Sequence, residues 1–264
     1  FDADAQADLK WKGTRVRTWS DADYIYTETR HFSVTRGGTM TSRISRVMEP
    51  EEFAGMTKDR LARIIEQELF VDEGAVTGEY PHPKNAEFLE RAMYVCPWCG
   101  LSTFESSGDV IRCLTCGREI RHLPTKELEG VGFEFPHRFV GDWYEAQKAF
   151  VNHLDLTELT ETPLYEETVR VSRVHAAKYK ELLKKDATVR LYGDRITLDD
   201  RVFPLDTVGA VVVLGKNKLN IYDGQEILQL KGDKRFNALK YVNFFHRFKN
   251  LKTGEKNNGQ FLGL

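Results

Sequence analysis

The sequence predicts a multi-domain α+β protein, and three patterns support this prediction. All four cysteines lie within one short segment, 96–116, as two CxxC pairs. From about residue 165, apolar and polar residues alternate through several short runs that turn residues separate, which is typical of antiparallel strands. One amphipathic helical pattern, at 237–250, follows these runs. At 264 residues, the chain is long enough for two or three compact units.

The N-terminal part combines short strands with one helix. Residues 10–48 are rich in Thr, Val, Tyr and Ile, and they predict two or three strands broken by the turn Arg36-Gly37-Gly38. A helical connector is expected at 49–93. Thr57 is a suitable N-cap for an amphipathic helix, and a second short helix is expected after Asn85. The apolar positions of the first helix recur at i, i+3, i+4 and i+8: Leu61, Ile64, Ile65 and Leu69.

The cysteine segment predicts a zinc ribbon at 94–122. Each CxxC pair is followed by a glycine, which permits the left-handed conformation that such a turn favours. Ser107-Gly108-Asp109 supplies the turn of a hairpin that joins the two pairs. Four thiolates in a tetrahedron suit Zn²⁺ and leave no position for a water, so we expect a structural metal rather than hydrolytic chemistry. An iron centre and a dithiol redox pair remain as alternatives. The expected ligands are Cys96, Cys99, Cys113 and Cys116.

The charge balance argues against a nucleic-acid partner. The net charge of the chain is −2, and the charges around the ribbon nearly cancel, whereas nucleic-acid binding usually requires a basic excess. Trp98 and Phe104 are able to stack on bases, but they are equally suited to packing the small ribbon against its neighbours. We therefore expect no nucleic acid among the partners.

A linker with one helix is expected at 123–164. Residues 124–136 are expected to form a loop. Asp142 and Glu145 have the D-x-x-E spacing of a capping box, which would open a helix that ends at about Leu154. Trp143, Ala146 and Phe150 would form the core-facing stripe of that helix.

The C-terminal region at 165–250 predicts an antiparallel β-roll capped by one helix. The expected turns are Gly193-Asp194, Asp199-Asp200, Gly215-Lys216 and Asp223-Gly224. This order of elements is that of a pleckstrin-homology-like roll, in which the helix closes one end of a bent sheet. The tail at 251–264 is polar and rich in glycine, so we expect it to be disordered. The strand segments are ETVRVSRVHAA, ATVRLYGD, RITLDD, VGAVVVLG, KLNIYDG and QEILQLKG; the helix carries Leu239, Val242, Phe245 and Phe248 on one face.

Two short motifs raise the question of catalysis. His137 and Asp142 have the H-x4-D spacing of glycerolipid acyltransferases, in which the histidine is a general base. Because Asp142 is already explained as a helix cap, we regard the match as accidental. Residues 12–15, KGTR, resemble the E-G-T-R phosphate-binding motif of the same enzymes but stand on the wrong side of the histidine. The catalytic residues are therefore unknown from this sequence.

The order of several segments resembles one subgroup of bacterial 1-acylglycerol-3-phosphate acyltransferases, which belong to the lysophospholipid acyltransferase family. Residues 29–75 are similar to the end of that catalytic domain, with an R-G-x-M segment, a P-E-E segment and a helix start at Met-Thr. The subgroup also has a zinc-ribbon extension, a D-W-x-x-x-Q helix, a V-F-P-L strand and an A-L-K-Y helix. The corresponding segments here are CPWCG with CLTCG, 142–147, 202–205 and 238–241.

This resemblance implies that the chain is the non-catalytic C-terminal part of an enzyme that moves a fatty acyl group from an acyl-thioester donor onto a lysophosphatidate-like acceptor. Residues 1–48 would then be the truncated tail end of the acyltransferase domain. The family's N-H-x4-D and E-G-T-R motifs precede its R-G-x-M segment, so the resemblance gives no catalytic role to His137 or Asp142. A membrane surface or lipid substrate would be the partner of the parent enzyme.

The setting expected from the residues is cytoplasmic, and the resemblance places the parent enzyme at the inner face of the membrane. Clustered cysteines with metal-site spacing are typical of a reducing compartment. FDADAQADLK has neither the basic nor the apolar region of a signal peptide, and since Phe1 is not a Met we expect a fragment or a processed product. The competing hypothesis is a non-enzymatic zinc-ribbon scaffold for protein or RNA. Five basic residues could form a weakly basic rim: Lys216, Lys218, Lys231, Lys234 and Arg235. We interpret them as solvated charges on loops rather than as a lipid-binding surface.

Overall fold

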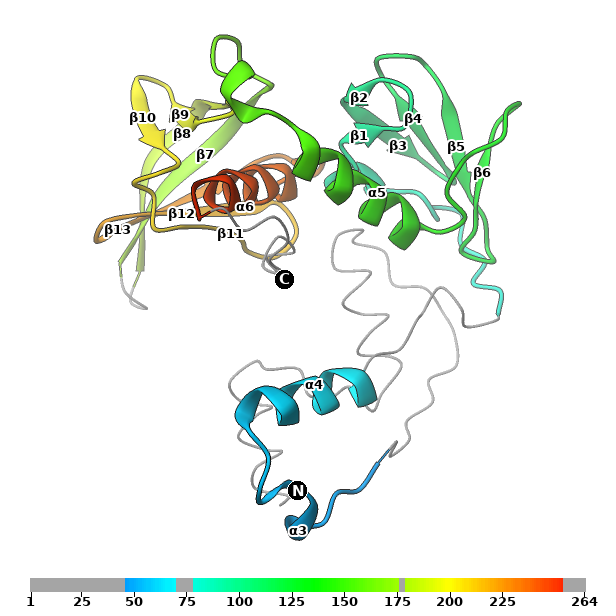
Figure 1. Cartoon of the computed structure of the whole chain (residues 1–264). Helices are drawn as coiled ribbons and strands as arrows, with labels where there is room; N and C mark the ends of the chain where they lie inside the picture. The colour runs from blue at the N-terminus through cyan, green and yellow to red at the C-terminus, as the bar shows by residue number, and fades with distance from the viewer. Residues whose placement is uncertain (1–45, 70–77, 176–178, 254–264) are drawn as a thin grey trace. The chain divides into compact units, whose positions relative to one another are not determined.

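A computed structural model describes residues 46–69, 78–175 and 179–253, which form two compact units (Figure 1). The first unit includes the described residues up to Pro81, and the second begins at His82. Of the segment 10–48, in which strands are expected, only 46–48 is described, and it is not a strand. The tail expected at 251–264 lies outside the described residues from 254 onward, but residues 251–253 are the end of the last helix rather than part of a disordered tail. None of the described helices is long and apolar enough to span a bilayer.

The first unit contains the two helices α3 (Pro50–Phe53) and α4 (Lys58–Leu69). Pro50 starts α3, where a proline costs no hydrogen bond. Thr57 caps α4 as expected: its Oγ1 accepts a hydrogen bond from the Arg60 backbone N–H at 3.3 Å. Arg46 connects the two helices through ion pairs with Glu52 and Glu68.

The cysteine region of the second unit consists of two small antiparallel sheets. The first pairs β1 (Val95–Cys96) with β2 (Gly100–Leu101). The second has the strand order β3-β4-β5-β6. Its strands are β3 (Phe104–Ser107), β4 (Val110–Cys113), β5 (Glu119–His122) and β6 (Leu128–Gly130).

Two local expectations for this region need correction. The helix expected after Asn85 is a single turn of 3-10 helix, η1 (Leu89–Arg91), because the preceding Phe88 adopts a left-handed φ of 68°. The loop expected at 124–136 contains strand β6, because a turn with Lys126 at φ 72° returns the chain to pair with β5. Neither feature has a hydrophobic period long enough to identify it in the sequence.

Helix α5 (Val140–His153) begins two residues before the expected capping residue. Asp142 lies in its first turn, and its Oδ2 accepts a hydrogen bond from the Phe139 N–H at 2.9 Å. Of the expected core stripe, Trp143 is buried, whereas Phe150 is 36% exposed. The buried face follows a different row of residues: Val140, Trp143, Gln147 and Val151. A 3-10 turn, η2 (Leu156–Glu158), then leads into the large sheet.

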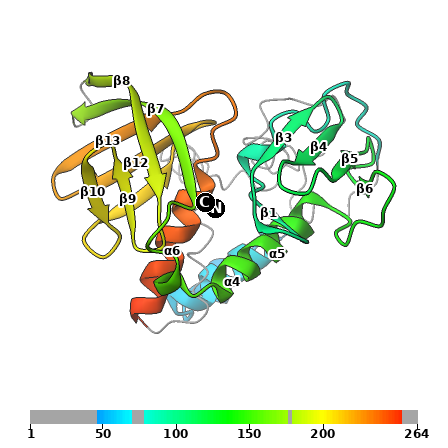
Figure 2. The same ribbon diagram turned by 90° about the horizontal axis from the view of Figure 1, so that it is seen from above.

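The C-terminal region is a curled, seven-stranded antiparallel sheet with the order β10-β9-β8-β7-β13-β12-β11 (Figures 1 and 2). The expected turns are present, and Asp199, Gly215 and Gly224 have φ values of 49°, 67° and 58°. The strands are β7 (Tyr165–His175), β8 (Tyr179–Leu191), β9 (Arg195–Leu198), β10 (Arg201–Pro204), β11 (Ala210–Val213), β12 (Lys218–Asp223) and β13 (Glu226–Lys231).

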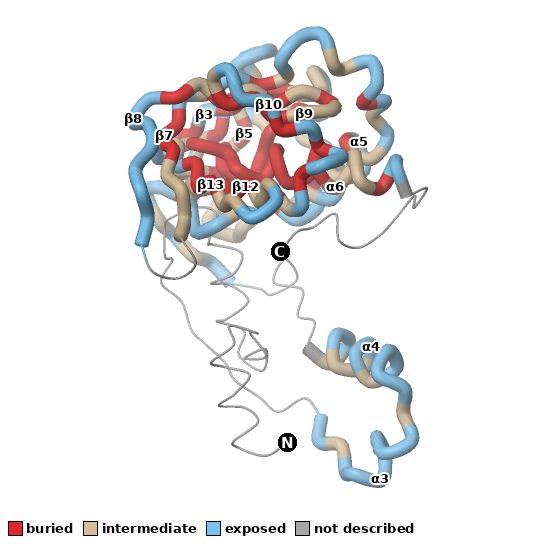
Figure 3. The backbone as a smooth tube through the Cα atoms, turned by 90° about the vertical axis from the view of Figure 1, so that its left-hand side faces the viewer, coloured by how far each residue is buried: buried red, intermediate tan, exposed pale blue. Residues whose placement is uncertain are grey.

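The first half of β8 is the largest departure from the strand pattern. The segment from Tyr179 to Asp186 is exposed along its whole length, yet it pairs with β7 (Figure 3). This half of the strand could not be predicted from the sequence. Both of its faces are solvated, so its residues do not alternate between apolar and polar. Pairing with β7 supplies its backbone hydrogen bonds instead.

Helix α6 (Leu239–Thr253) packs against the sheet, and the core of the second unit surrounds its first half. Every residue from Leu239 to Phe245 is buried, so this part of the helix is enclosed on all sides rather than along one face. Figures 1 and 2 show α6 along the sheet and α5 running from the cysteine region toward it. The fold is therefore mixed α+β, with a curled antiparallel sheet and a four-cysteine cluster.

Candidate metal centre and the adjoining cleft

The four expected cysteines come together in one cluster. Their Sγ atoms all lie within 4.8 Å of one another, and the Sγ atoms of Cys96 and Cys116 are 3.9 Å apart. A tetrahedral Zn²⁺ with bonds of about 2.3 Å would place its sulfurs about 3.8 Å apart, so the donor set fits such an ion. The cluster is therefore able to hold a metal ion.

The chain forms the cluster from two similar turns. Cys96 ends β1 and Cys113 ends β4, so each strand delivers the first thiol of its pair. Gly100 and Gly117 follow the second thiols with φ values of 72° and 73°, which is the left-handed conformation expected from the sequence. The Gly117 N–H donates to the Cys113 carbonyl at 2.9 Å and closes the second turn.

The thiols differ in electrostatic environment. Burial raises the pKa of Cys96 to about 12, and burial also raises the pKa of Cys99. Burial opposes ionisation of Cys116 too, but hydrogen bonds from Arg118 and from neighbouring thiols outweigh it and lower the pKa to about 6. Without a cation, therefore, the pKa values of Cys96 and Cys116 lie far apart, whereas a bound metal would favour the thiolate form of its ligands.

Aromatic side chains surround the cluster. Trp98 is 42% exposed, and its ring packs edge to face on Phe133 with the centroids 5.1 Å apart. The guanidinium of Arg118 covers the Trp98 ring at 4.6 Å. Phe104 is buried against Trp143, with centroids 5.4 Å apart. Of the two base-stacking candidates, Phe104 is thus occupied in the core.

Helix α5 holds the cysteine region through its buried polar side chains. Gln147 Oε1 accepts from the backbone N–H groups of Tyr94 and Val95 at 2.8 and 3.1 Å, and Gln147 Nε2 donates to the Ala92 carbonyl at 2.9 Å. Trp143 Nε1 donates to the Val95 carbonyl at 2.9 Å. These bonds fix the strand that carries Cys96.

The segment between β13 and α6 holds the other side of the same region. Arg235 forms an ion pair with the buried carboxylate of Glu90, and its Nη1 also donates to the Ser106 carbonyl at 2.8 Å. Asn237 Nδ2 donates to the Glu90 carbonyl at 3.0 Å. The cysteine region and the curled sheet are consequently joined by buried polar contacts within one compact unit.

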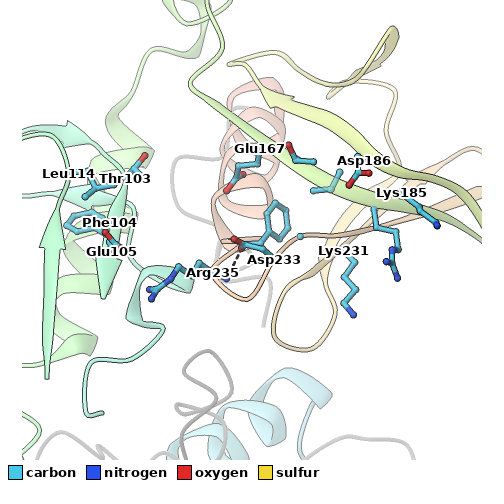
Figure 4. A pocket seen from close by; sticks show the side chains of 15 residues that line it. Thr103, Phe104, Glu105, Leu114, Glu167, Lys185, Asp186, Lys231, Asp233 and Arg235 are labelled. Carbon is cyan, nitrogen blue, oxygen red and sulfur yellow. Dashed lines mark hydrogen bonds between the residues drawn. The ribbon is translucent and has the colours of Figure 1, made fainter. Parts of the chain in front are cut away.

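A cleft of about 790 Å³ opens beside this junction (Figure 4). One wall comes from the cysteine region, with Thr103, Glu105 and Leu114, and the other from β7, β8 and β13. Figure 4 shows the side chains of Lys185 and Lys231 on the sheet side. Glu167, which also lines the cleft, accepts from Lys240 Nζ at 2.9 Å and from Tyr241 Oη at 2.7 Å.

Lys240 is a buried cation that the sequence did not identify. Only 5% of the residue is exposed, burial lowers its pKa, and the carboxylate of Glu167 opposes that shift. Its Nζ also lies 4.1 Å from the centroid of the Tyr165 ring. A lysine in a helical sequence is normally assigned to the surface. The ion pair between Lys240 and Glu167 is therefore visible only in the folded structure.

Both residues of the H-x4-D motif, His137 and Asp142, make contacts that stabilise the local fold. Asp142 caps α5, and the His137 ring packs edge to face on Phe135 with centroids 5.5 Å apart. Partial burial lowers the pKa of His137, and Asp142 opposes this shift. Residues 12–15 lie outside the described residues.

The basic rim expected from the sequence does not act as one surface. Arg235 turns inward to Glu90, and the Lys234 carbonyl accepts a hydrogen bond from Arg91. Lys216 is exposed on a turn, whereas Lys231 lines the cleft.

Comparisons with known proteins give little further information. No protein-family model matches the chain, and no curated protein matches it either. Among solved structures, the chain is similar to the solution structure of the N-terminal PH domain of human ARAP2, with 13% identity and a TM-score of 0.26. The likeness covers 33% of this chain and 82% of that one.

Proposed function

We propose that the four-cysteine cluster is a structural zinc site. Its donor set consists of four thiols, so a bound Zn²⁺ would have no open position for water or substrate. The bound ion would supply cross-linking between the β1–β2 turn and the β4–β5 turn. The set of four thiol donors is the observation that carries the proposal. With all four positions filled by thiolates, the ion would have a structural role and could not activate a water for hydrolysis. The cysteine region would then be a zinc ribbon.

The curled sheet supports assignment of the C-terminal region as a pleckstrin-homology-like roll. Strands β7 to β10 form one meander and β11 to β13 form another, and β13 joins them by pairing with β7. Helix α6 follows the last strand and packs on the sheet. Seven strands followed by one helix support such a roll, and β10 is a strand in addition to the six segments expected from the sequence.

We infer further that these modules are the non-catalytic C-terminal region of a lysophospholipid acyltransferase. The support is the order of the sequence segments: the R-G-x-M and P-E-E segments, the ribbon, the D-W-x-x-x-Q helix, the V-F-P-L strand and the A-L-K-Y helix. The parent enzyme would use an acyl-thioester donor and a lysophosphatidate-like acceptor at the cytoplasmic face of the membrane. The modules would act as a rigid docking region for that enzyme.

Native mass spectrometry tests the metal. The wild-type chain should carry one zinc per molecule, and Cys113→Ser should lose it and melt at a lower temperature. Ser107→Ala is a suitable control because Ser107 is exposed on β3, between the two CxxC pairs, and contributes no thiol. A wild-type chain without bound metal, or a Cys113→Ser variant with the wild-type melting curve, would refute structural zinc.

The reading frame upstream of Phe1 tests the enzyme assignment. An N-H-x4-D motif followed by E-G-T-R is expected there, and the encoded protein should acylate lysophosphatidate from an acyl-thioester. An in-frame start codon directly at the boundary would favour the non-enzymatic scaffold instead. This outcome is independent of the zinc measurement, so the two proposals can fail separately.

A further inference from the structure

Two side chains that are not ligands connect the two CxxC turns of the cysteine cluster. Trp98 lies between the cysteines of the first turn, and Arg118 comes shortly after the second turn. The Arg118 guanidinium lies 4.6 Å from the centroid of the Trp98 ring. The two turns therefore meet through this contact as well as through their thiols.

The backbone fixes both residues next to a thiol. In the first turn, the Trp98 N–H donates to the Cys96 sulfur. In the second turn, the backbone N–H and the guanidinium of Arg118 both donate to the Cys116 sulfur. The Arg118 carbonyl also accepts a hydrogen bond from the Cys113 N–H at 3.0 Å. The guanidinium is thus attached at two points, the Trp98 ring and the Cys116 sulfur.

Aromatic packing holds the Trp98 ring in place. Besides its contact with Phe133, the ring lies 6.0 Å from the ring of Phe135, measured between centroids. Phe135 packs edge to face on the buried Trp143 of α5, with the centroids 5.1 Å apart. Trp98 therefore offers a supported aromatic face, and an arginine stacks on such a face through a cation–π interaction.

Arg118 has no acidic partner, in contrast to a nearby arginine. Among the residues that the structure describes, no carboxylate forms an ion pair with Arg118. Arg121 on β5 pairs with Asp109 at 3.3 Å and with Glu129 at 3.6 Å. The charge of Arg118 is consequently left to act on the thiols.

A metal-bound cluster would benefit from such a cation. Four thiolates carry more negative charge than one divalent ion neutralises, so negative charge would remain on the sulfurs. Hydrogen bonds from a charged donor are stronger than those from a neutral one. Groups that hydrogen-bond to metal ligands commonly change the metal affinity by about 10- to 100-fold.

We propose that Arg118, held on the Trp98 ring, is the counter-cation of the metal–thiolate cluster and strengthens metal binding. It supplies no ligand atom and acts through Cys116, so it is a positioning residue. The contact with Trp98 also joins the two turns without the ion, which leaves less ordering to be done when the ion binds. This inference rests on the proposal that the cluster binds zinc.

Zinc release from the full chain tests the inference. Native mass spectrometry first shows whether the wild type carries zinc, and a chelator that changes colour with zinc then measures affinity and release rate. Arg118→Gln should bind zinc about tenfold or more weakly and release it faster. Arg118→Lys keeps the charge without the planar group and should recover part of the loss. Arg121→Gln removes the same charge from β5 and should bind zinc like the wild type.

A double-mutant cycle tests the role of the ring. Trp98→Leu keeps an apolar side chain but removes the aromatic face that holds Arg118. The combined variant Trp98→Leu/Arg118→Gln should lose about as much affinity as Arg118→Gln alone, because the two side chains act as one unit. Independent, additive losses would overturn the stacked pair.

Cobalt in place of zinc separates this role from a folding defect. With saturating Co²⁺, Arg118→Gln should keep the absorption of a tetrahedral thiolate site and a melting temperature near that of the wild type. Its sulfur-to-cobalt charge-transfer band should shift, because the Cys116 sulfur loses a charged donor.

The two proposals fail in different ways. A wild type that binds zinc, together with an Arg118→Gln variant of unchanged affinity, release rate and cobalt spectrum, would overturn the role of Arg118 and leave the zinc site intact. A wild type that binds neither zinc nor cobalt would overturn both.

Discussion

Arg235 donates to the buried carboxylate of Glu90, and this ion pair joins the segment before α6 to the turn that precedes the cysteine cluster. The Glu90 side chain is only 4% exposed, and Ser106 also donates to it. Burial raises the pKa of Glu90, while the hydrogen bonds and the charge of Arg235 oppose that shift. The junction therefore depends on a polar network with little access to water.

Removal of Arg235 should destabilise the second unit substantially. Arg235→Ala leaves the Glu90 carboxylate buried without its cation. Because the Arg235 side chain is itself 37% exposed and Ser106 still donates to Glu90, we expect a cost of about 1–3 kcal/mol. Urea unfolding followed by tryptophan fluorescence measures the loss. Lys234→Ala is the matched control, because that exposed side chain has no such partner and only the Lys234 carbonyl bonds to Arg91. Similar unfolding free energies for the two variants would contradict the importance of the ion pair.

Gln147 should be intolerant of an apolar replacement. Leucine is similar in size to glutamine, but Gln147→Leu leaves the backbone groups of Ala92, Tyr94 and Val95 without their hydrogen-bond partner. Each buried unsatisfied group costs about 1–3 kcal/mol. We expect a loss of about 3 kcal/mol or more in the free energy of unfolding. Ala149→Leu on the exposed face of α5 should have little effect. If both substitutions are tolerated equally, α5 does not hold the cysteine region by these bonds.

The cysteine cluster was predictable because its geometry is local. The C-x2-C spacing and the following glycine define each turn without reference to the rest of the chain, and Gly100 and Gly117 have the conformation that this predicts. The alternating strands and their Gly-containing turns were predictable for the same reason.

The junction was not predictable, because its residues are defined by partners distant in sequence. Glu90, Gln147 and Lys240 are polar, so a pattern of apolar residues assigns them to the surface. Each is buried only because a distant segment supplies its hydrogen bonds, as Glu167 does for Lys240.

Gly100 and Gly117, the glycines that follow the two CxxC pairs, should differ in their sensitivity to substitution by alanine. At Gly117 an added Cβ would meet only Arg112 Nη2 at 3.8 Å, so Gly117→Ala should cost about 1–2 kcal/mol for the left-handed conformation alone. At Gly100 the Cβ would also lie 3.0 Å from Phe150 Cζ and force that ring to move. We therefore expect Gly100→Ala to lower the melting temperature, and the affinity of the cysteine cluster for a metal ion, more than Gly117→Ala does.

Gly141 provides the control for these two variants. It lies in the first turn of α5, has no neighbour within 4 Å of an added Cβ and does not adopt a positive φ. Gly141→Ala should be neutral or slightly stabilising because alanine favours a helix. Equal effects at all three glycines would show that neither φ nor the Phe150 contact determines the cost.

Glu226 should give the curled sheet a dependence on acid. Its carboxylate accepts from Arg173 Nε at 2.7 Å and from Arg201 Nη2 at 2.9 Å, and the hydrogen bond from Arg173 is the main reason that its pKa lies below the ordinary value of 4.5. Because the folded pKa is depressed, the stabilisation is complete above about pH 4.5 and is lost as the pH falls through the folded pKa. Glu226→Gln should thus be less stable than the wild type by about 1 kcal/mol at pH 7 and equally stable well below pH 4. Urea unfolding across this range measures the difference, with the exposed Glu161→Gln as control; a difference independent of pH would exclude the carboxylate as its source.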